Sequence, residues 1–147
     1  MTLPPLFLYG TLRDPDILAA VLGRAMAEGD LVAAAAPDCA AVYFPGQLYP
    51  ALVQRTGGSA PGLLLSRATA DDMAALDAFE GDQYRRGPVL AATATALVAA
   101  EVYWPAIAVN PFAADWTLER WMREHKPQVL LHETAMARAA RLATARA

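Results

Sequence analysis

Apolar and polar positions along the chain predict strands and helices in turn. Leu3 to Tyr9 is short and apolar, with prolines only at its entry, as expected of a buried strand. Asp14 and Pro15 then mark a helix start, with Asp14 as N-cap and Pro15 in the first helical position. The apolar face of this helix comprises Ile17, Leu18, Val21 and Leu22. Gly23 is the expected end of the helix.

The pattern changes to that of strands between Asp30 and Arg67. The expected strands are Leu31 to Ala36, Ala40 to Phe44, Ala51 to Arg55 and Gly62 to Ser66. Turn signals separate them at Pro37-Asp38, Pro45-Gly46 and Gly57-Gly58. The region is therefore expected to supply most of a sheet.

A second helix is predicted from Thr69 to Phe79. Thr69 with Asp72 three residues later resembles a capping box at its start. Gly81 breaks the helical pattern at its end.

The last third of the chain is predicted as a strand pair followed by helix. Pro88 to Ala96 and Leu97 to Trp104 carry the apolar residues of the pair, and Phe112 to Arg146 is helical in character with a split near Pro127. The whole order predicts one α+β domain spanning residues 1–147, built around a curved sheet that can close into a barrel, with a helical tail from about residue 112.

Composition narrows the class of protein. The chain has 147 residues, 56% of them hydrophobic and 18% charged, which is typical of a globular domain. The formal charge of −3 argues against nucleic acid as a partner. No apolar run is long enough to span a bilayer, and the single cysteine, Cys39, excludes an internal disulfide. We therefore expect a cytoplasmic protein, either a monomer or a homodimer.

The sequence lacks the residue patterns typical of metal sites, phosphate-binding loops and α/β-hydrolase nucleophiles. His125 and His132 are the only histidines and stand in no metal-ligand pattern. The glycine-rich stretch 57–62 lacks the Lys-Ser/Thr ending of a phosphate loop, and no serine lies in a G-x-S-x-G context. We therefore expect an enzyme with no metal, cofactor or covalent intermediate. Holding two groups of one substrate together can supply about 7–11 kcal/mol of a barrier, which leaves a proton carrier to be provided.

Glu80 is the best candidate for that proton carrier. Met73 and Leu76 lie seven and four residues before it, so all three share one helix face. A carboxylate therefore stands where the apolar stripe predicts leucine, in the last turn, where the helix dipole disfavours negative charge. Broken local rules of this kind are common at functional sites.

Other interpretations of these carboxylates remain open. Glu80 can also belong to a frayed helix end, paired with Arg85 or Arg86. Glu101, which interrupts a strand, and Asp82, in a turn, are rival acids.

The joint between the first strand and the first helix is the second candidate feature. The amides of Gly10, Thr11 and Leu12 have no ladder of their own, and such amides can cradle an anion such as a carboxylate. Gly10 allows close approach of a ligand, and Tyr9 can wall the pocket. The alternative is an ordinary strand-to-helix turn with Tyr9 in the core.

Four segments, in this order, resemble the gamma-glutamylcyclotransferase-like family, in particular its gamma-glutamylamine cyclotransferase and avirulence-induced-gene-like branch. They are LFLYGTLRDP near the start, LYPAL from Leu48, LDAFEGDQYRR from Leu76 and AEVYWP from Ala99. The Y-G-T-L loop joined to F-E-G-x-x-Y-x-R at this distance is a strong signal.

The resemblance implies a small mixed β-barrel with peripheral helices and no cofactor. It also implies cyclisation of a γ-glutamyl amine or peptide to 5-oxoproline, with Glu80 as acid/base. The family's glutamyl-binding loop corresponds to Tyr9, Gly10, Thr11 and Leu12, and further substrate-pocket tyrosines correspond to Tyr84, Tyr49 and Tyr103. The leaving amine stays open. Two alternatives also stay open: a non-catalytic module that binds an amino-acid-like ligand, and removal of a γ-glutamyl protecting group from a biosynthetic intermediate.

Overall fold

The computed structural model of the chain describes residues 3–27 and 29–126. Its elements, in chain order, are β1 (Leu6–Leu8), the 3₁₀ turn η1 (Thr11–Arg13), α1 (Pro15–Leu22), β2 (Leu31–Tyr43), β3 (Pro50–Leu65), α2 (Ala70–Glu80), the 3₁₀ turn η2 (Gly81–Gln83), β4 (Tyr84–Ala92), β5 (Leu97–Pro105), α3 (Leu118–Arg120) and the π-helical turn η3 (Trp121–His125).

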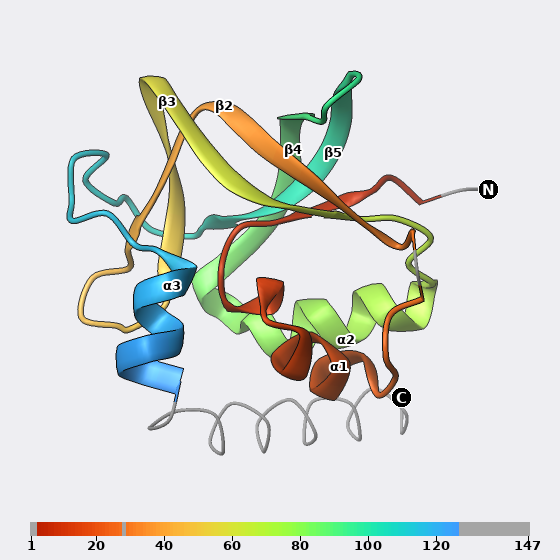
Figure 1. The fold of residues 1–147 in the computed structure, drawn as a ribbon. Helices are drawn as coiled ribbons and strands as arrows, with labels where there is room; N and C mark the ends of the chain where they lie inside the picture. The colour runs from red at the N-terminus through yellow and green to blue at the C-terminus, as the bar shows by residue number, and fades with distance from the viewer. Residues whose placement is uncertain (1–2, 28, 127–147) are drawn as a thin grey trace.

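The strands close into a barrel in the order β1-β3-β2-β4-β5 (Figure 1). Neighbouring strands are antiparallel except at the closure, where β1 lies parallel to β5. There the Glu101 amide donates to the Pro5 carbonyl at 2.9 Å. The helices α1 and α2 lie together on one side of the barrel. This is the mixed barrel with peripheral helices that the family resemblance implies.

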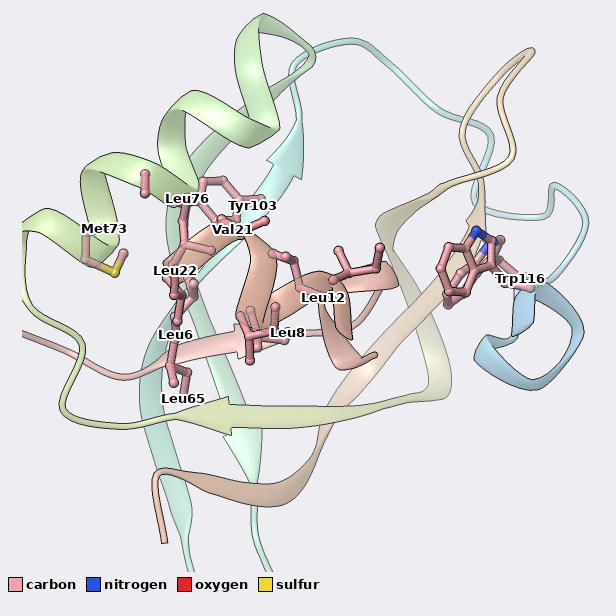
Figure 2. Packing of buried hydrophobic residues seen from close by; sticks show 14 residues of the cluster. Leu6, Leu8, Leu12, Val21, Leu22, Leu65, Met73, Leu76, Tyr103 and Trp116 are labelled. Carbon is pink, nitrogen blue, oxygen red and sulfur yellow. The ribbon is translucent and has the colours of Figure 1, made fainter. Parts of the chain in front are cut away.

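Both faces of β1 are buried, which explains why its three residues are all apolar. Side chains alternate across a strand, so Leu6 and Leu8 share one face and Phe7 points the other way. Leu6 and Leu8 pack in the cluster between the barrel and the two helices, together with Leu76 of α2 (Figure 2). Phe7 belongs to the second cluster, which fills the barrel. The N-terminal strand is therefore fixed on two sides.

Small side chains fill much of the barrel interior. Ala36, Ala60, Ala91 and Ala100 are buried there beside Phe7. A barrel of so few strands is narrow, so large side chains from every strand would not fit within it. These four alanines therefore suit the narrow interior of the barrel.

Two long strands, β2 and β3, replace the shorter ones predicted between Leu31 and Ser66. Pro37-Asp38 does not turn the chain; it forms a bulge at which the β2–β3 register shifts. Asp38 has φ +57°, and its Oδ1 accepts from the Gly57 amide at 2.9 Å. Gly57, at φ +83°, lets β3 bend over the bulge without ending. Turn residues therefore mark a bend within one ladder.

The hairpin of β4 and β5 begins and turns earlier than predicted. β4 starts at Tyr84 and ends at Ala92, and the turn lies at Thr93 to Ala96. The Thr93 hydroxyl accepts from the Ala96 amide at 3.1 Å, which closes this turn. The alternation of small residues concealed that boundary.

The predicted helix from Phe112 starts later, at Leu118. The segment before it runs along β2. The Trp116 amide donates to the Ala41 carbonyl, and Asp115 forms an isolated antiparallel β-bridge with Val42. Pairing with a strand edge satisfies that backbone, so it does not form helix. The predicted split at Pro127 and the remainder of the tail lie outside the described residues.

The helix caps follow the predictions. Asp14 accepts from the Asp16 amide at 2.9 Å, and α1 ends at Gly23. At the start of α2, Thr69 and Asp72 form the expected capping box. Within the described part of the chain, no helix has the length and apolar character needed to cross a membrane.

Asp72 is expected to make stability depend on acid pH. Burial raises the pKa of Asp72, but hydrogen bonds from Thr69 and Arg24 and the Arg24 charge outweigh it and hold the pKa below its usual range. Its contribution is therefore present above the unfolded value of about 3.9 and lost as pH falls through the lower folded value. Asp72→Asn should lower the free energy of unfolding at neutral pH and by less in acid.

Urea unfolding at a series of pH values measures this difference. The control is Asp71→Asn, which changes an exposed carboxylate in the same helical turn. A loss of stability in Asp72→Asn that stays constant across the acid range would contradict the assignment.

Candidate active site

A cavity of about 400 Å³ opens where β1 leaves the barrel. Its walls come from the end of β1 and η1, from the segment 47–50, from the end of α2 and from β4 and β5. The preferred acid–base candidate and all the substrate-binding candidates of the sequence analysis line it: Glu80, Tyr9, Gly10, Thr11, Leu12, Tyr49, Tyr84 and Tyr103. Segments far apart in the sequence thus meet around one hollow.

Glu80 is the last residue of α2 and is half-buried at the cavity wall. Met73 and Leu76, on the same helix face, are buried against the barrel, so Glu80 continues an apolar stripe into the cavity. Its negative charge contributes to the raised pKa values of Tyr9, Tyr49 and Tyr103, after burial as the largest cause for each. The carboxylate therefore acts electrostatically on three phenols around it.

The rival acids do not line this cavity. Glu101 lies on β5, with its Oε2 3.8 Å from Nε of Arg86. Asp82 is exposed in η2. Within the described part of the chain, Glu80 is the one carboxylate among the cavity-lining residues, and the lining set includes no lysine, arginine or histidine.

Tyr9 is both a core residue and a cavity residue. Its hydroxyl donates to the Tyr103 carbonyl at 2.7 Å, which ties the end of β1 to β5. Burial, then the Glu80 charge, raises the pKa of Tyr9 well above its usual value, while the Leu52 amide, which hydrogen-bonds its oxygen, opposes the rise. Tyr9 therefore remains a neutral phenol with its proton engaged.

The Tyr103 hydroxyl forms a hydrogen bond with α2. It donates to Oδ1 of Asp77 at 2.7 Å. Burial, this hydrogen bond and the charges of Asp77 and Glu80 raise the pKa of Tyr103 far above its usual value, against a smaller opposing effect of Arg86. Tyr103 therefore stays protonated at any physiological pH.

Tyr49 and Tyr84 form an aromatic wall with Phe44. The ring centroids lie 5.5 Å (Phe44–Tyr49), 5.6 Å (Phe44–Tyr84) and 6.2 Å (Tyr49–Tyr84) apart. The Tyr84 hydroxyl donates to the Pro50 carbonyl at 2.6 Å, and the Tyr49 hydroxyl donates to Oε1 of Gln83. Each tyrosine of the cavity thus donates its proton to a protein acceptor.

Gly10 has a packing role that the sequence interpretation did not include. A Cβ at this position would stand 2.9 Å from Cγ of Pro50, closer than real contacts allow. The loop therefore lies directly against the start of β3. Beyond it, the Arg13 amide donates to the Gly10 carbonyl at 3.0 Å, which begins η1.

The loop before α1 and the N-terminus of α1 differ in whether their backbone amides are capped. The N-terminus of α1 is already capped by Asp14, whose Oδ2 also accepts from Nζ of Lys126 at 2.8 Å. The amides of Thr11 and Leu12 open η1 and have no acceptor within that turn. Any anion held at this wall would therefore meet η1.

Sequence reasoning did not assign roles to Pro50, Gln83 or Phe79, which also line the cavity. The Pro50 ring packs against Gly10, and the Pro50 carbonyl accepts a hydrogen bond from the Tyr84 hydroxyl. It stands inside the L-Y-P-A-L segment, so the motif contained the signal, but the sequence alone did not show what Pro50 touches.

Comparisons with known proteins agree on one family. The family model described as Gamma-glutamyl cyclotransferase, AIG2-like matches residues 6–123. AIG2-like protein A of Arabidopsis thaliana is 30% identical over 127 residues, which cover 84% of this chain and 75% of that protein. AIG2-like protein B of the same organism is 29% identical over 124 residues, which cover 82% and 70%.

Solved structures share the fold. A solution structure of a protein from Arabidopsis thaliana superposes with a TM-score of 0.67 at 28% identity and covers 92% of both chains. A structure titled gamma-glutamyl cyclotransferase superposes with a TM-score of 0.55 at 12% identity, covering 70% of this chain and 66% of the other, which is a likeness of fold alone.

Gly10→Ala is expected to destabilise the protein through Pro50. The added methyl group must displace the proline ring, at a cost of about 1–3 kcal/mol of unfolding free energy. Pro50→Ala removes the ring atom that the methyl group would meet, so the double variant should lose less stability than the sum of the two single variants. Denaturant unfolding of the four proteins measures this coupling. Additive losses would show that the contact with Pro50 does not constrain position 10.

Proposed function

The chain belongs to the Gamma-glutamyl cyclotransferase, AIG2-like family, and from this premise we propose that it cyclises a γ-glutamyl amide to 5-oxoproline and releases the amine. The observation that carries the proposal is the cavity itself. One carboxylate, Glu80, lies in the same hollow as the amides of η1, which follow the first strand. A small molecule with an ammonium and a carboxylate on one carbon matches these two features.

The proposed reaction needs no group from outside the substrate except a proton carrier. The α-amino nitrogen attacks the γ-carbonyl carbon, and a new C–N bond closes a five-membered ring. The bond from that carbon to the departing nitrogen then breaks. The ammonium nitrogen loses two protons and the departing nitrogen gains two, so no water is consumed. Binding in the bent conformation lowers the barrier through orientation.

Glu80 would carry these protons. It takes one from the ammonium, which frees the lone pair for attack, and delivers protons to the departing amine. The amides of Thr11 and Leu12 would hold the substrate carboxylate, and hydrogen bonds from this wall stabilise developing negative charge on the γ-oxygen. The phenols Tyr9 and Tyr103 are neutral and therefore add no negative charge beside Glu80.

The charges around the cavity favour a leaving amine without a carboxylate. Among its described lining residues, no cationic side chain is available to pair with a second carboxylate on the substrate. The faces of Tyr49 and Tyr84 attract cations and apolar groups, and Leu48 adds apolar surface. We therefore propose γ-glutamyl amines as better substrates than γ-glutamyl amino acids.

Glu80→Gln is expected to lower kcat for 5-oxoproline release by about 10²–10⁴-fold, the usual contribution of a general acid–base. The assay uses purified protein with a panel of γ-glutamyl amines, dipeptides and larger γ-glutamylated amines, with product measured by chromatography. Circular dichroism checks that the fold is retained.

Glu101→Gln and Asp82→Asn are the matched controls, because both acids lie outside the cavity lining. Full activity of Glu80→Gln would overturn the assignment. Binding of the panel without turnover by the wild type would favour a non-catalytic binding module, and turnover of the larger compounds alone would favour removal of a protecting group.

A cation placed at the rim should change substrate preference. Leu48 is partly exposed at the cavity, so Leu48→Arg brings a guanidinium near the leaving group. The ratio of kcat/KM for γ-glutamyl amino acids over γ-glutamyl amines should rise by up to about fivefold, the scale of a partly exposed ion pair. Leu48→Gln controls for length and polarity. An unchanged ratio in Leu48→Arg would contradict the charge argument.

A further inference from the structure

Asp77 lies one helical turn before Glu80 on α2 and outside the cavity lining. Its carboxylate has two partners from the barrel. Oδ1 accepts the Tyr103 hydroxyl at 2.7 Å, and Oδ2 accepts from Nη2 of Arg86 at 3.2 Å. The Asp77 side chain is 44% exposed, and that of Arg86 is 31% exposed. The Asp77 carboxylate therefore links α2, which carries Glu80, to Tyr103 of β5 and Arg86 of β4.

A phenol has one proton to donate, so the direction of the Tyr103 hydroxyl matters. Tyr103 lines the cavity, and the Glu80 charge acts on its hydroxyl. If the hydroxyl donated to Glu80, that hydrogen bond would stabilise the carboxylate and weaken it as a base. Because the hydroxyl donates to Asp77, the Tyr103 oxygen can still accept a hydrogen bond.

We propose that Asp77 is a positioning residue that acts through Tyr103: it holds the Tyr103 proton away from Glu80 and keeps the phenol oxygen as an acceptor facing the site. This proposal rests on the proposed function for its kinetic consequence. An acceptor beside Glu80 suits a bound ammonium, which has protons to donate. Asp77 also withholds from Glu80 one hydrogen bond that would weaken the carboxylate as a base.

The other charged groups around Tyr103 do not replace this role. The charged residues that act on the Tyr103 hydroxyl are Asp77 and Glu80 from α2 and Arg86 from β4. Glu101 of β5 approaches Arg86, and Tyr9 donates to the Tyr103 carbonyl. Arg86 is a donor, and Tyr9 reaches the backbone of Tyr103. The Tyr103 hydroxyl donates its hydrogen bond to Asp77.

The test compares Asp77→Ala, Tyr103→Phe and the double variant with wild type, using pH profiles of kcat and kcat/KM. In Asp77→Ala the Tyr103 hydroxyl is free to donate to Glu80. We expect kcat to fall by about tenfold, the effect of one altered hydrogen bond in the transition state, and the acidic limb of kcat/KM to move to lower pH. When Tyr103→Phe is already present, adding Asp77→Ala should leave the limb where Tyr103→Phe alone puts it.

This cycle separates three explanations. If Asp77 acts only through its charge, the limb moves equally with and without Tyr103→Phe. If Asp77 only stabilises the fold, the midpoint of thermal unfolding falls but the limb does not move. Either outcome overturns the proposal. Asp71→Ala, which changes an exposed carboxylate on the same helix, should match wild type.

A second measurement does not depend on turnover. In protein labelled with [ζ-¹³C]tyrosine, the Tyr103 signal, assigned by Tyr103→Phe, reports the state of its hydroxyl. We expect this signal to follow a carboxyl titration in Asp77→Ala, and the titration to vanish in Asp77→Ala combined with Glu80→Gln. An identical signal in wild type and Asp77→Ala at every pH would overturn the proposal. If wild type releases no 5-oxoproline, the proposed function fails, while this measurement still decides the role of Asp77.

Discussion

Closure of the barrel through β1 is the constraint on which the candidate site depends. β1 is short, yet it is buried on both faces, pairing with β3 on one side and β5 on the other. Its exit is therefore fixed beside Tyr103, and the loop Gly10 to Leu12 must leave the barrel at that point. The end of α2 packs over the same opening, which brings Glu80 to the loop. The parallel pairing of β1 with β5 therefore positions the Gly10 to Leu12 loop next to Glu80.

The hydrogen-bond directions at the cavity give it a defined polarity. Each cavity tyrosine donates its hydroxyl hydrogen bond to a protein acceptor, so its O–H group is already engaged while its oxygen can still accept. Thr11 and Leu12 form the wall that carries the start of η1, where the first amides have no acceptor within the turn. In the proposed function, acceptors around one carboxylate and amides at the loop would complement a zwitterionic substrate. This polarity follows from the whole hydrogen-bond network, which includes Asp77.

Placing Glu80 at the end of an apolar stripe has an energetic cost, because burial disfavours a charged carboxylate and the helix dipole opposes it. Other contacts of α2 offset this cost. Asp72 caps the helix and binds Arg24 at 2.6 Å, and Leu76 is fully buried against the barrel. Asp77 adds a third attachment through Tyr103. The helix is thus held firmly enough to present an unfavourable residue at its last turn.

The sequence by itself determined the elements with local signals: the caps at Asp14 and Thr69, the buried first strand and the misplaced Glu80, since propensity and periodicity act between near neighbours. Only the tertiary structure decided which of the predicted turn residues end a strand and which bend a continuous one. Asp38 and Gly57 bend one ladder because a partner strand pairs across them. The tertiary structure also decided that the Pro50 ring packs against Gly10, because this contact joins residues distant along the chain and no local pattern encodes it.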